Sequence, residues 1–378
     1  MFGGEKMRKA ALAAVITAVV LMLSGCGENA YRKDKEIKVG LLLSQQAVTE
    51  QASELLWGIE TAEEDLERKY GQQGYTITTE VFDDGGKKGE AAHQAEKILE
   101  REDIDFVFVL SRDEELEKAA KKLEKGKKIT FWLDEEGEAV RQKGGKYQFA
   151  NLYSLQAQAE TVINHLQGGG IKNLAVVYTP VGFSYQEYLA LRQAAEQNGI
   201  TICAELELAQ RTPDDAVKTV RESGAQAVAV LAGNTTKNVD LVRAVRKLMP
   251  EAVVLSDHTV DQTETLKTDA RALEGTLIPC GIKTQWEAAE LNSVIQRYEA
   301  VYKDTTQVGR VSHGYFSLSA VADGTVECGT ADPRTLEKYF RSPSSARYQF
   351  GEDGTLIYDS IPILQAKNGV FEILIRED

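Results

Sequence analysis

One segment of the sequence has part of the pattern of a catalytic serine. Residues 182–186 read GFSYQ and lie between a predicted strand and a predicted helix. A G-x-S-x-G elbow holds its serine on a sharp turn and needs a glycine on each side. Gln186 takes the place of the second glycine, so the turn that would expose Ser184 lacks its usual residue. We therefore do not expect Ser184 to be a nucleophile, and a secreted hydrolase is the weakest of the functions considered.

Other patterns of catalysis and cofactor binding are missing from the sequence. It contains no G-x-x-x-x-G-K-[ST] phosphate loop and no G-x-G-x-x-G after a predicted strand. The four histidines are far apart and lack the spacing of metal ligands. Two acidic runs, at 113–115 and 134–136, suit the positive ends of helices. We expect no enzyme activity, no cofactor and no metal site.

Cys26 ends the first apolar segment in a pattern that points to lipid attachment. Basic residues precede an apolar run over 10–23, which is shorter than the roughly 20 residues of a membrane-spanning helix. A basic start, a short apolar run and small residues are typical of a secretory signal peptide. LSGC at 23–26 resembles the bacterial lipobox, whose cysteine receives two acyl chains, and two chains give stable anchoring. We expect residues 1–26 to be a lipoprotein signal peptide ending at the lipidated Cys26, and residues 27–36 to be a polar tether. The alternative is an ordinary signal peptide with an incidental cysteine.

The net charge limits the kind of partner, and the number of cysteines limits the disulfides. The net charge is −14, which argues against binding nucleic acid or anionic lipid, because both need basic patches. Besides Cys26 the chain has Cys203, Cys280 and Cys328, which allow at most one internal disulfide. We expect these three to be buried thiols.

The elements that would position a site alternate along the chain. Helical patterns, such as residues 53–70, separate short apolar or β-branched segments. The predicted strands cover 37–43, 75–82, 104–110, 128–133, 173–178, 200–208, 225–232 and 252–257. This alternation is typical of parallel sheets covered by helices, and the pattern restarts after a glycine-rich turn at 167–173. We predict an α/β fold with two Rossmann-like lobes. Near the C-terminus we predict two β-hairpins, with turns at 352–354 and 367–369.

Polar and aromatic residues follow the predicted strands, where parallel α/β sheets bind their ligands. In the first lobe these residues are Ser44, Ser111, Arg112 and Asp134, with Trp132 at the end of the fourth strand. In the second lobe they are Phe183, Asn234, Asp257 and His258. Two lobes facing each other would place these residues around a cleft for a small polar ligand.

The order of several segments resembles a known family. They include IKVGLLLS from residue 37, VFDDGGKKGEAAHQAEKIL at 81–99 and VSHGYFSLSAVADG at 311–324. From Ile37 onwards the chain resembles the leucine/isoleucine/valine-type solute-binding proteins of ABC importers. This resemblance implies a type I periplasmic binding fold with three interlobe crossovers, near residues 150, 280 and 350. The implied lobe 1 is 37–150 plus 281–350, and the implied lobe 2 is 151–280 plus 351–378.

The resemblance also implies which lobe holds each charged group of an amino-acid ligand. Ser111 matches a position that holds the ligand carboxylate, and the second such position falls near Asp134, which would repel a carboxylate. Arg112 could supply a bidentate partner instead. Asp257 matches the acidic residue that holds the ammonium group. The ammonium side is therefore kept and the carboxylate side is altered, which leaves amino-acid derivatives, amides and polyamine-like cations open.

Several of these residues also have a purely structural explanation. Tyr315 and Phe183 match family aromatics near the cleft, but either could pack in the wall between the lobes. Asp257 could cap the next helix, because Asp is a preferred N-cap residue. Trp132 could belong to the core, and Asp83-Asp84 look structural because they close a strand and a turn.

These observations predict an extracytoplasmic lipoprotein, anchored to the outer face of a bacterial membrane. We expect a monomer that captures a small polar solute and delivers it to the membrane permease of an ABC importer. The alternative is a sensor or regulatory lipoprotein of the same fold that acts through a membrane or cell-wall protein. The altered loops LSRDEE and LDEEGE keep that alternative open.

Overall fold

The computed structural model describes nine segments of the chain. They are residues 35–44, 53–111, 113–133, 145–208, 211–279, 289–303, 308–343, 348–357 and 361–374. Within these segments no helix is long and apolar enough to cross a membrane.

The first sheet is parallel throughout, in the order β2-β1-β3-β4-β5. Its strands are β1 (Glu36–Leu43), β2 (Thr76–Asp83), β3 (Phe106–Leu110), β4 (Ile129–Trp132) and β5 (Gln148–Phe149). One face packs against α3 (Ser53–Tyr70), α13 (Val308–Cys328) and α14 (Pro333–Phe340), and α12 (Ala289–Tyr302) packs on α3 and α13. The other face packs against α4 (Glu90–Leu99) and α5 (Leu116–Lys125).

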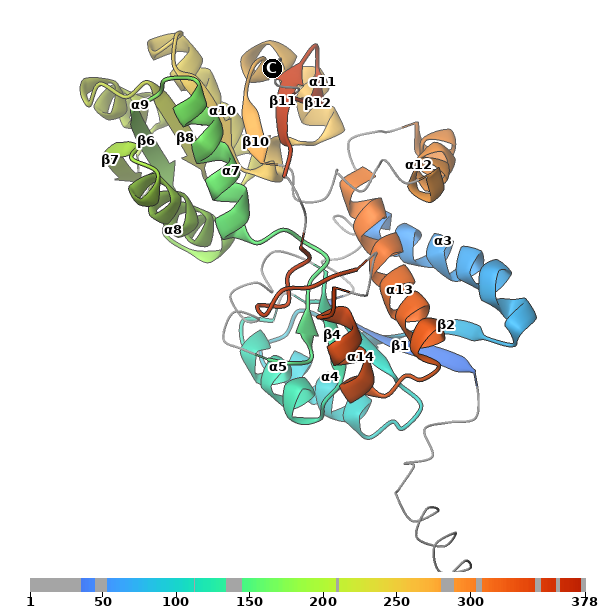
Figure 1. The fold of residues 1–378 in the computed structure, drawn as a ribbon. Coiled ribbons are helices and arrows are strands. Elements are labelled where there is room, and N and C mark those ends of the chain that lie inside the picture. The colour runs from blue at the N-terminus through green and yellow to red at the C-terminus, as the bar shows by residue number, and fades with distance from the viewer. Residues whose placement is uncertain are drawn as a thin grey trace, which may run out of the picture.

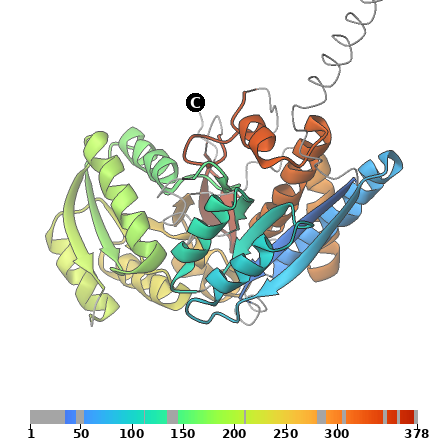
Figure 2. The same ribbon diagram turned by 90° about the horizontal axis from the view of Figure 1, so that it is seen from below.

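The second sheet has the order β12-β11-β10-β9-β8-β6-β7. Its strands are β6 (Asn173–Tyr178), β7 (Thr201–Glu207), β8 (Ala227–Leu231), β9 (Val253–Ser256), β10 (Leu277–Pro279), β11 (Ile363–Lys367) and β12 (Val370–Ile373). The five strands β6 to β10 are parallel, and β11 and β12 add an antiparallel hairpin. One face packs against α7 (Leu155–Gly168) and α8 (Gly182–Gln197), the other against α9 (Pro213–Glu222), α10 (Thr235–Leu248) and α11 (Thr263–Leu273). Figures 1 and 2 show each sheet with its helices as a separate lobe.

The alternating pattern of the sequence is confirmed as an α/β fold of two lobes. All eight predicted strands are present, and α3 covers the predicted helix. The chain passes from one sheet to the other after β5, after β10 and between Ile357 and β11, which gives three crossovers. Because hydrophobic periodicity reports burial on one or both faces of an element, it located these strands well.

The predicted C-terminal hairpins have different outcomes. The second is confirmed, since β11 and β12 join through Asn368 and Gly369, both with positive φ. The hairpin predicted around 352–354 forms only one isolated antiparallel bridge, between Phe350 and Leu356, with Gly354 in the turn. This segment also bonds to β5's end, where the Ala150 N–H donates to the Gly354 carbonyl at 2.8 Å. Residues 351–357 therefore pack with the first sheet, although the sequence assigned them to lobe 2.

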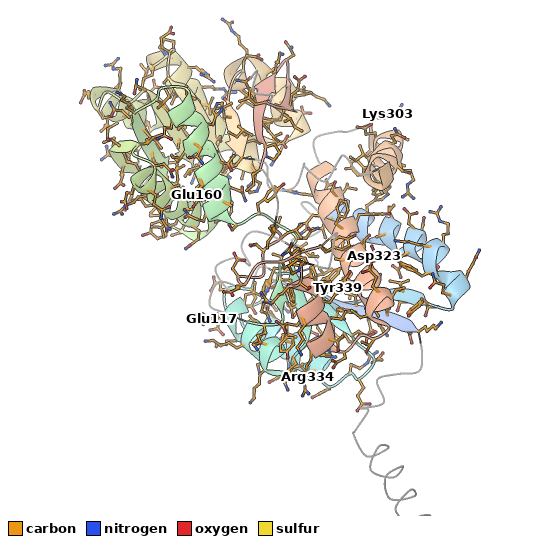
Figure 3. The ribbon with its side chains drawn as sticks, viewed as in Figure 1. Glu117, Glu160, Lys303, Asp323, Arg334 and Tyr339 are labelled. Carbon is orange, nitrogen blue, oxygen red and sulfur yellow. The ribbon has the colours of Figure 1, made fainter. Side chains whose placement is uncertain are left out.

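Helices α3 and α13 hold the first lobe together by a close contact. A Cβ atom on Gly58 would lie 2.1 Å from the Val311 carbonyl oxygen, and one on Gly314 would lie 2.1 Å from that of Leu55. Only glycine permits two backbones to approach so closely. Further along α13, the buried Asp323 accepts a 2.6 Å hydrogen bond from the Tyr70 hydroxyl of α3. Figure 3 shows Asp323 on α13, in the part of the first lobe that also holds Tyr339 of α14.

Candidate functional site

A buried carboxylate joins three loops at the carboxyl edge of the first sheet. Asp84 follows β2, while Ser44 and Ser111 follow the neighbouring strands β1 and β3. The Ser44 hydroxyl donates to Asp84 Oδ1 at 2.6 Å, and the Ser111 hydroxyl donates to Asp84 Oδ2. The Gly86 N–H donates to Oδ1 as well, at 2.8 Å. All three side chains are at most 2% exposed, so this cluster ties the strand ends together.

Asp113 extends this cluster by binding backbone N–H groups. Its carboxylate accepts bonds from Gly89 and Glu115 at 2.8 Å and from Ala91 at 2.9 Å. Its own N–H donates to the Ser111 hydroxyl oxygen at 3.1 Å. Burial by itself would raise the pKa of Asp113, but the three N–H donors outweigh it and leave the pKa below the usual value for Asp. The acidic run at 113–115 therefore has a structural role at its first residue.

The cluster changes how Ser44 and Ser111 are to be interpreted. The sequence predicted both as ligand contacts, and the structure brings them together with their hydroxyl protons directed at Asp84. Sequence reasoning treated Asp84 as the end of a turn and did not connect it with the two serines. One sequence feature could have indicated this role of Asp84. The residue directly follows the predicted strand 75–82 and Asp83, and two glycines come after it.

The second sheet has a matching carboxylate at its carboxyl edge. Asp257 follows β9 and is 0% exposed. Its Oδ2 accepts bonds from the Gly233 N–H at 2.9 Å and from Asn238 Nδ2 at 2.7 Å. Its Oδ1 accepts from the Thr259 N–H at 3.0 Å and from the Thr259 hydroxyl at 2.5 Å. Four donors thus occupy this carboxylate, and Asp257 caps the short helix η2 (His258–Val260). A contact between Asp257 and a ligand ammonium group stays a prediction. The ammonium group would have to replace at least one of these four donors.

Three other predicted residues lie at the same edge of the second sheet. The rings of Phe183 and His258 meet edge to face, with centroids 5.1 Å apart, and both side chains are partly exposed. Asn234 caps α10, where its side-chain oxygen accepts from the Lys237 N–H at 3.1 Å. Phe183 is the second residue of α8, which follows β6, and His258 is the second residue after β9. This edge therefore presents an aromatic pair beside a buried carboxylate.

Two predicted residues lie in the first lobe's interior. Trp132 is 0% exposed and donates from Nε1 to Gln148 Oε1 at 2.8 Å. Tyr315 belongs to the core beneath α13, and its hydroxyl donates to Asp65 Oδ2 at 3.1 Å. Asp65 is also paired with Arg297 of α12. Both aromatic side chains thus have structural partners, and their contact with a ligand stays a prediction.

Arg112, Asp134 and Cys26 lie outside the described residues. Ser184 lies in the first turn of α8 and is 3% exposed. Within the described segments, no group of three or more His, Cys, Asp or Glu side chains is arranged to hold a metal ion.

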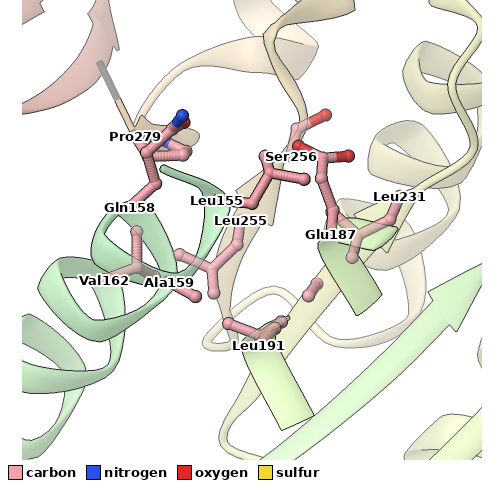
Figure 4. A pocket seen from close by; sticks show the side chains of 11 residues that line it. Leu155, Gln158, Ala159, Val162, Glu187, Leu191, Leu231, Leu255, Ser256 and Pro279 are labelled. Carbon is pink, nitrogen blue, oxygen red and sulfur yellow. The ribbon is translucent and has the colours of Figure 1, made fainter. Parts of the chain in front are cut away.

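A cavity of about 40 Å³ lies inside the second lobe, between its sheet and the helices α7 and α8. Leu155, Gln158, Ala159 and Val162 line it from α7, and Glu187 and Leu191 from α8. The sheet contributes Ala229, Leu231, Leu255, Ser256 and Pro279. Figure 4 shows the carboxylate of Glu187 and the hydroxyl of Ser256 at one side and Leu191 at the other. The sequence did not predict this cavity, because its walls come from five separate elements.

Comparison with known proteins places this arrangement in context. A family model described as "Periplasmic binding protein" matches residues 36–350. A search of curated proteins finds no match. An ABC transporter substrate-binding protein from Desulfitobacterium hafniense, solved in complex with Leu, is 17% identical, with 90% of this chain and 100% of that chain covered and a TM-score of 0.74. The leucine-binding protein LivK from Thermotoga maritima is 15% identical, with coverage of 90% and 98% and a TM-score of 0.70. A substrate-binding protein from Sphaerobacter thermophilus is 15% identical, with coverage of 90% and 97% and a TM-score of 0.74.

Proposed function

The chain belongs to the periplasmic binding protein family, and from this premise we propose that it is an extracytoplasmic solute-binding lipoprotein of an ABC importer. In this proposal a small polar ligand, an amino acid or an amino-acid-like compound, binds between the two lobes. The observation that carries the proposal is the placement of polar and aromatic residues at the carboxyl edges of two parallel sheets joined by three crossovers. This is where parallel α/β sheets bind ligands.

The proposed mechanism is a shift between open and closed arrangements of the lobes. A ligand that contacts both edges has a higher affinity for the closed form and favours it by that difference. The transporter then recognises the closed form, and no bond of the ligand is broken or made. The two buried carboxylates support this mechanism, because Asp84 and Asp257 hold the loops of each edge rigid while the lobes move as bodies.

The ligand class follows from the second lobe's edge and from the relatives. Phe183 and His258 offer an aromatic surface for an aliphatic or aromatic side chain. Leucine is the first compound to test, since the Desulfitobacterium hafniense protein was solved with Leu. Amides and polyamines come next, because Ser111, which the resemblance matched to a carboxylate-holding position, donates to Asp84 instead.

The test is a melting-temperature measurement of the purified protein against amino acids, amides and polyamines. A ligand at 100 times its dissociation constant adds about 2.7 kcal/mol of stability. This corresponds to a shift of a few degrees for a protein of this size. A saturable shift that Phe183→Ala greatly weakens would support binding between the lobes. The absence of any shift across the series would count against solute capture and favour the second candidate.

The second candidate is a sensor or regulatory lipoprotein of the same fold. The observation in its favour is the commitment of the Ser44 and Ser111 hydroxyls to Asp84, which removes donors that an amino-acid carboxylate would need. Such a protein would act through contact with a membrane or cell-wall protein. Crosslinking in cells would separate the two functions, because a permease would be captured in the first case and a kinase or synthase in the second.

Lipid attachment at Cys26 is proposed from the sequence of the first segment. Two acyl chains on this residue would keep the protein close to its transporter. Metabolic labelling with a fatty acid, followed by purification, tests the attachment. Label in the wild type that is lost in Cys26→Ser would support it, and equal label in both would refute it.

A further inference from the structure

The cavity inside the second lobe has the composition of a binding site for an amphipathic cation. Apart from Gln158, Glu187 and Ser256, its lining side chains are aliphatic, with Leu191, Leu255 and Val162 among them. The one ionisable side chain in this lining is the Glu187 carboxylate, whose negative charge favours a cation over an anion as the occupant.

Ser256 is another polar residue in the wall of the cavity, and its hydroxyl lacks a partner in the described part of the chain. It is 1% exposed, and its Oγ has no hydrogen-bond partner among the residues that the structure describes. A buried hydroxyl without a partner is uncommon and carries a free-energy cost, which a bound donor would remove. Figure 4 shows this hydroxyl on the same side of the cavity as the carboxylate of Glu187.

We propose that this cavity binds the ammonium group of a short primary alkylamine. An ammonium group has three N–H donors and no acceptor, so one group can donate to both the Glu187 carboxylate and the Ser256 oxygen. The alkyl chain then lies against Leu191, Leu255 and Val162. The volume of about 40 Å³ limits the occupant, because each water-sized group needs roughly 10–15 Å³. A chain of about three carbons fits this space.

The cavity differs from the proposed interlobe site because one lobe alone forms it, although Leu231, Ser256 and Pro279 end their strands at the same carboxyl edge as Asp257. All its lining residues belong to elements of the second lobe. Leu155 is the first residue of α7, and Pro279 is the last residue of β10, so the cavity lies beside two of the three crossovers. The inference does not rest on the proposed function, and a protein that captures no solute between its lobes could still bind an amine here.

The experiment is a titration of the purified protein with n-propylammonium, followed by methyl NMR of Leu191, Leu255 and Val162. n-Propanol serves as the uncharged probe of similar shape. We expect saturable shifts of these methyl signals with n-propylammonium and at least tenfold weaker binding of n-propanol. Equal affinities for the two probes, or no saturable shift with the amine, would overturn the proposal.

Variants separate the roles of charge, hydroxyl and space. Glu187→Gln should raise the dissociation constant about tenfold or more, and Ser256→Ala roughly two- to tenfold. Ala159→Leu, which fills the cavity without changing its charge, should abolish the shifts. Folding of each variant is checked by its unperturbed methyl spectrum away from α7 and α8.

Two control variants complete the test. Glu196 lies on the same helix as Glu187 and pairs with Arg192 outside the cavity, so Glu196→Gln should leave the affinity unchanged. Phe183→Ala should also leave it unchanged, because that residue belongs to the interlobe edge. If Glu196→Gln lowered the affinity for n-propylammonium as much as Glu187→Gln, this would contradict a specific ion pair between the amine and Glu187. A large loss in Phe183→Ala would move the binding to the interlobe site and overturn the proposal.

Discussion

The Ser44 hydroxyl donates a 2.6 Å hydrogen bond to Asp84, which joins the ends of two neighbouring strands of the first sheet. Ser111 approaches the same carboxylate from the third strand. The buried side chain of Asp84 thus holds together the loops that would contact a ligand. The second lobe uses Asp257 in the same way, with backbone, amide and hydroxyl donors in place of serines.

Asp84→Asn should lower the free energy of unfolding by about 1–3 kcal/mol. An amide presents one acceptor and one donor group, so either a serine hydroxyl or the Gly86 N–H loses its partner while remaining buried or partly buried. Urea unfolding measures the loss. The matched control is Asp83→Asn, at an exposed neighbouring residue, which should change stability by less than about 0.5 kcal/mol. Equal losses in the two variants would show that the cluster has no special role.

Gly314→Ala should destabilise the first lobe by about 1–3 kcal/mol or more. The added Cβ would lie 2.1 Å from the Leu55 carbonyl oxygen, so α3 and α13 would have to move apart. Thermal unfolding reports the change. Gly71→Ala is the control, because a Cβ there has no neighbour within 4 Å. A melting temperature of Gly314→Ala equal to that of Gly71→Ala would contradict the close contact.

His313 should make the protein less stable as the pH falls below about 6.5. The residue is 2% exposed, and burial lowers its pKa to about 3 in the folded state. Between these values the unfolded chain binds more protons than the folded one, so stability rises with pH in this window and is lost on acidification. The contribution reaches about 1.4 kcal/mol per pH unit.

Unfolding free energies of the wild type and of His313→Leu between pH 4 and pH 7.5 measure this contribution. We expect the difference between the two proteins to shift in favour of the variant as the pH falls. His93→Gln serves as the control, because His93 is an exposed histidine on α4. A pH dependence that His313→Leu leaves unchanged would show that other groups cause the acid sensitivity.

Phe183→Ala should reduce the melting-temperature shift produced by an interlobe ligand, with little effect on the protein alone. The side chain is partly exposed and contacts His258, so its loss removes a binding surface and little of the core. Tyr302→Ala is the matched control, because this aromatic residue is 54% exposed on α12 of the other lobe. A ligand shift that is equally reduced in both variants would argue against a site at Phe183.

Much of the fold could be predicted without the structure. The strands and α3 follow from periodic burial, which depends on residues close together in the sequence. The turn at Asn368 and Gly369 follows from the positive φ that these residue types tolerate. The bridge around Gly354 was harder to predict from the sequence, because residues 350–357 also bond to Ala150, some two hundred residues earlier. That contact draws the segment to the first sheet instead of into a hairpin of its own.

Less of the candidate site than of the fold could be predicted from the sequence. The positions of Ser44, Ser111 and Asp257 at the edges of sheets follow from the sequence alone, because the two serines come directly after predicted strands and the aspartate is the last residue of one. Only the tertiary structure decided what those side chains bind. A hydrogen bond depends on which donors and acceptors lie within about 3 Å of each other, and here the partners are 19 to 40 residues apart in the chain. Likewise, only the tertiary structure showed that the Tyr315 ring packs in the core and that its hydroxyl donates to Asp65 of α3.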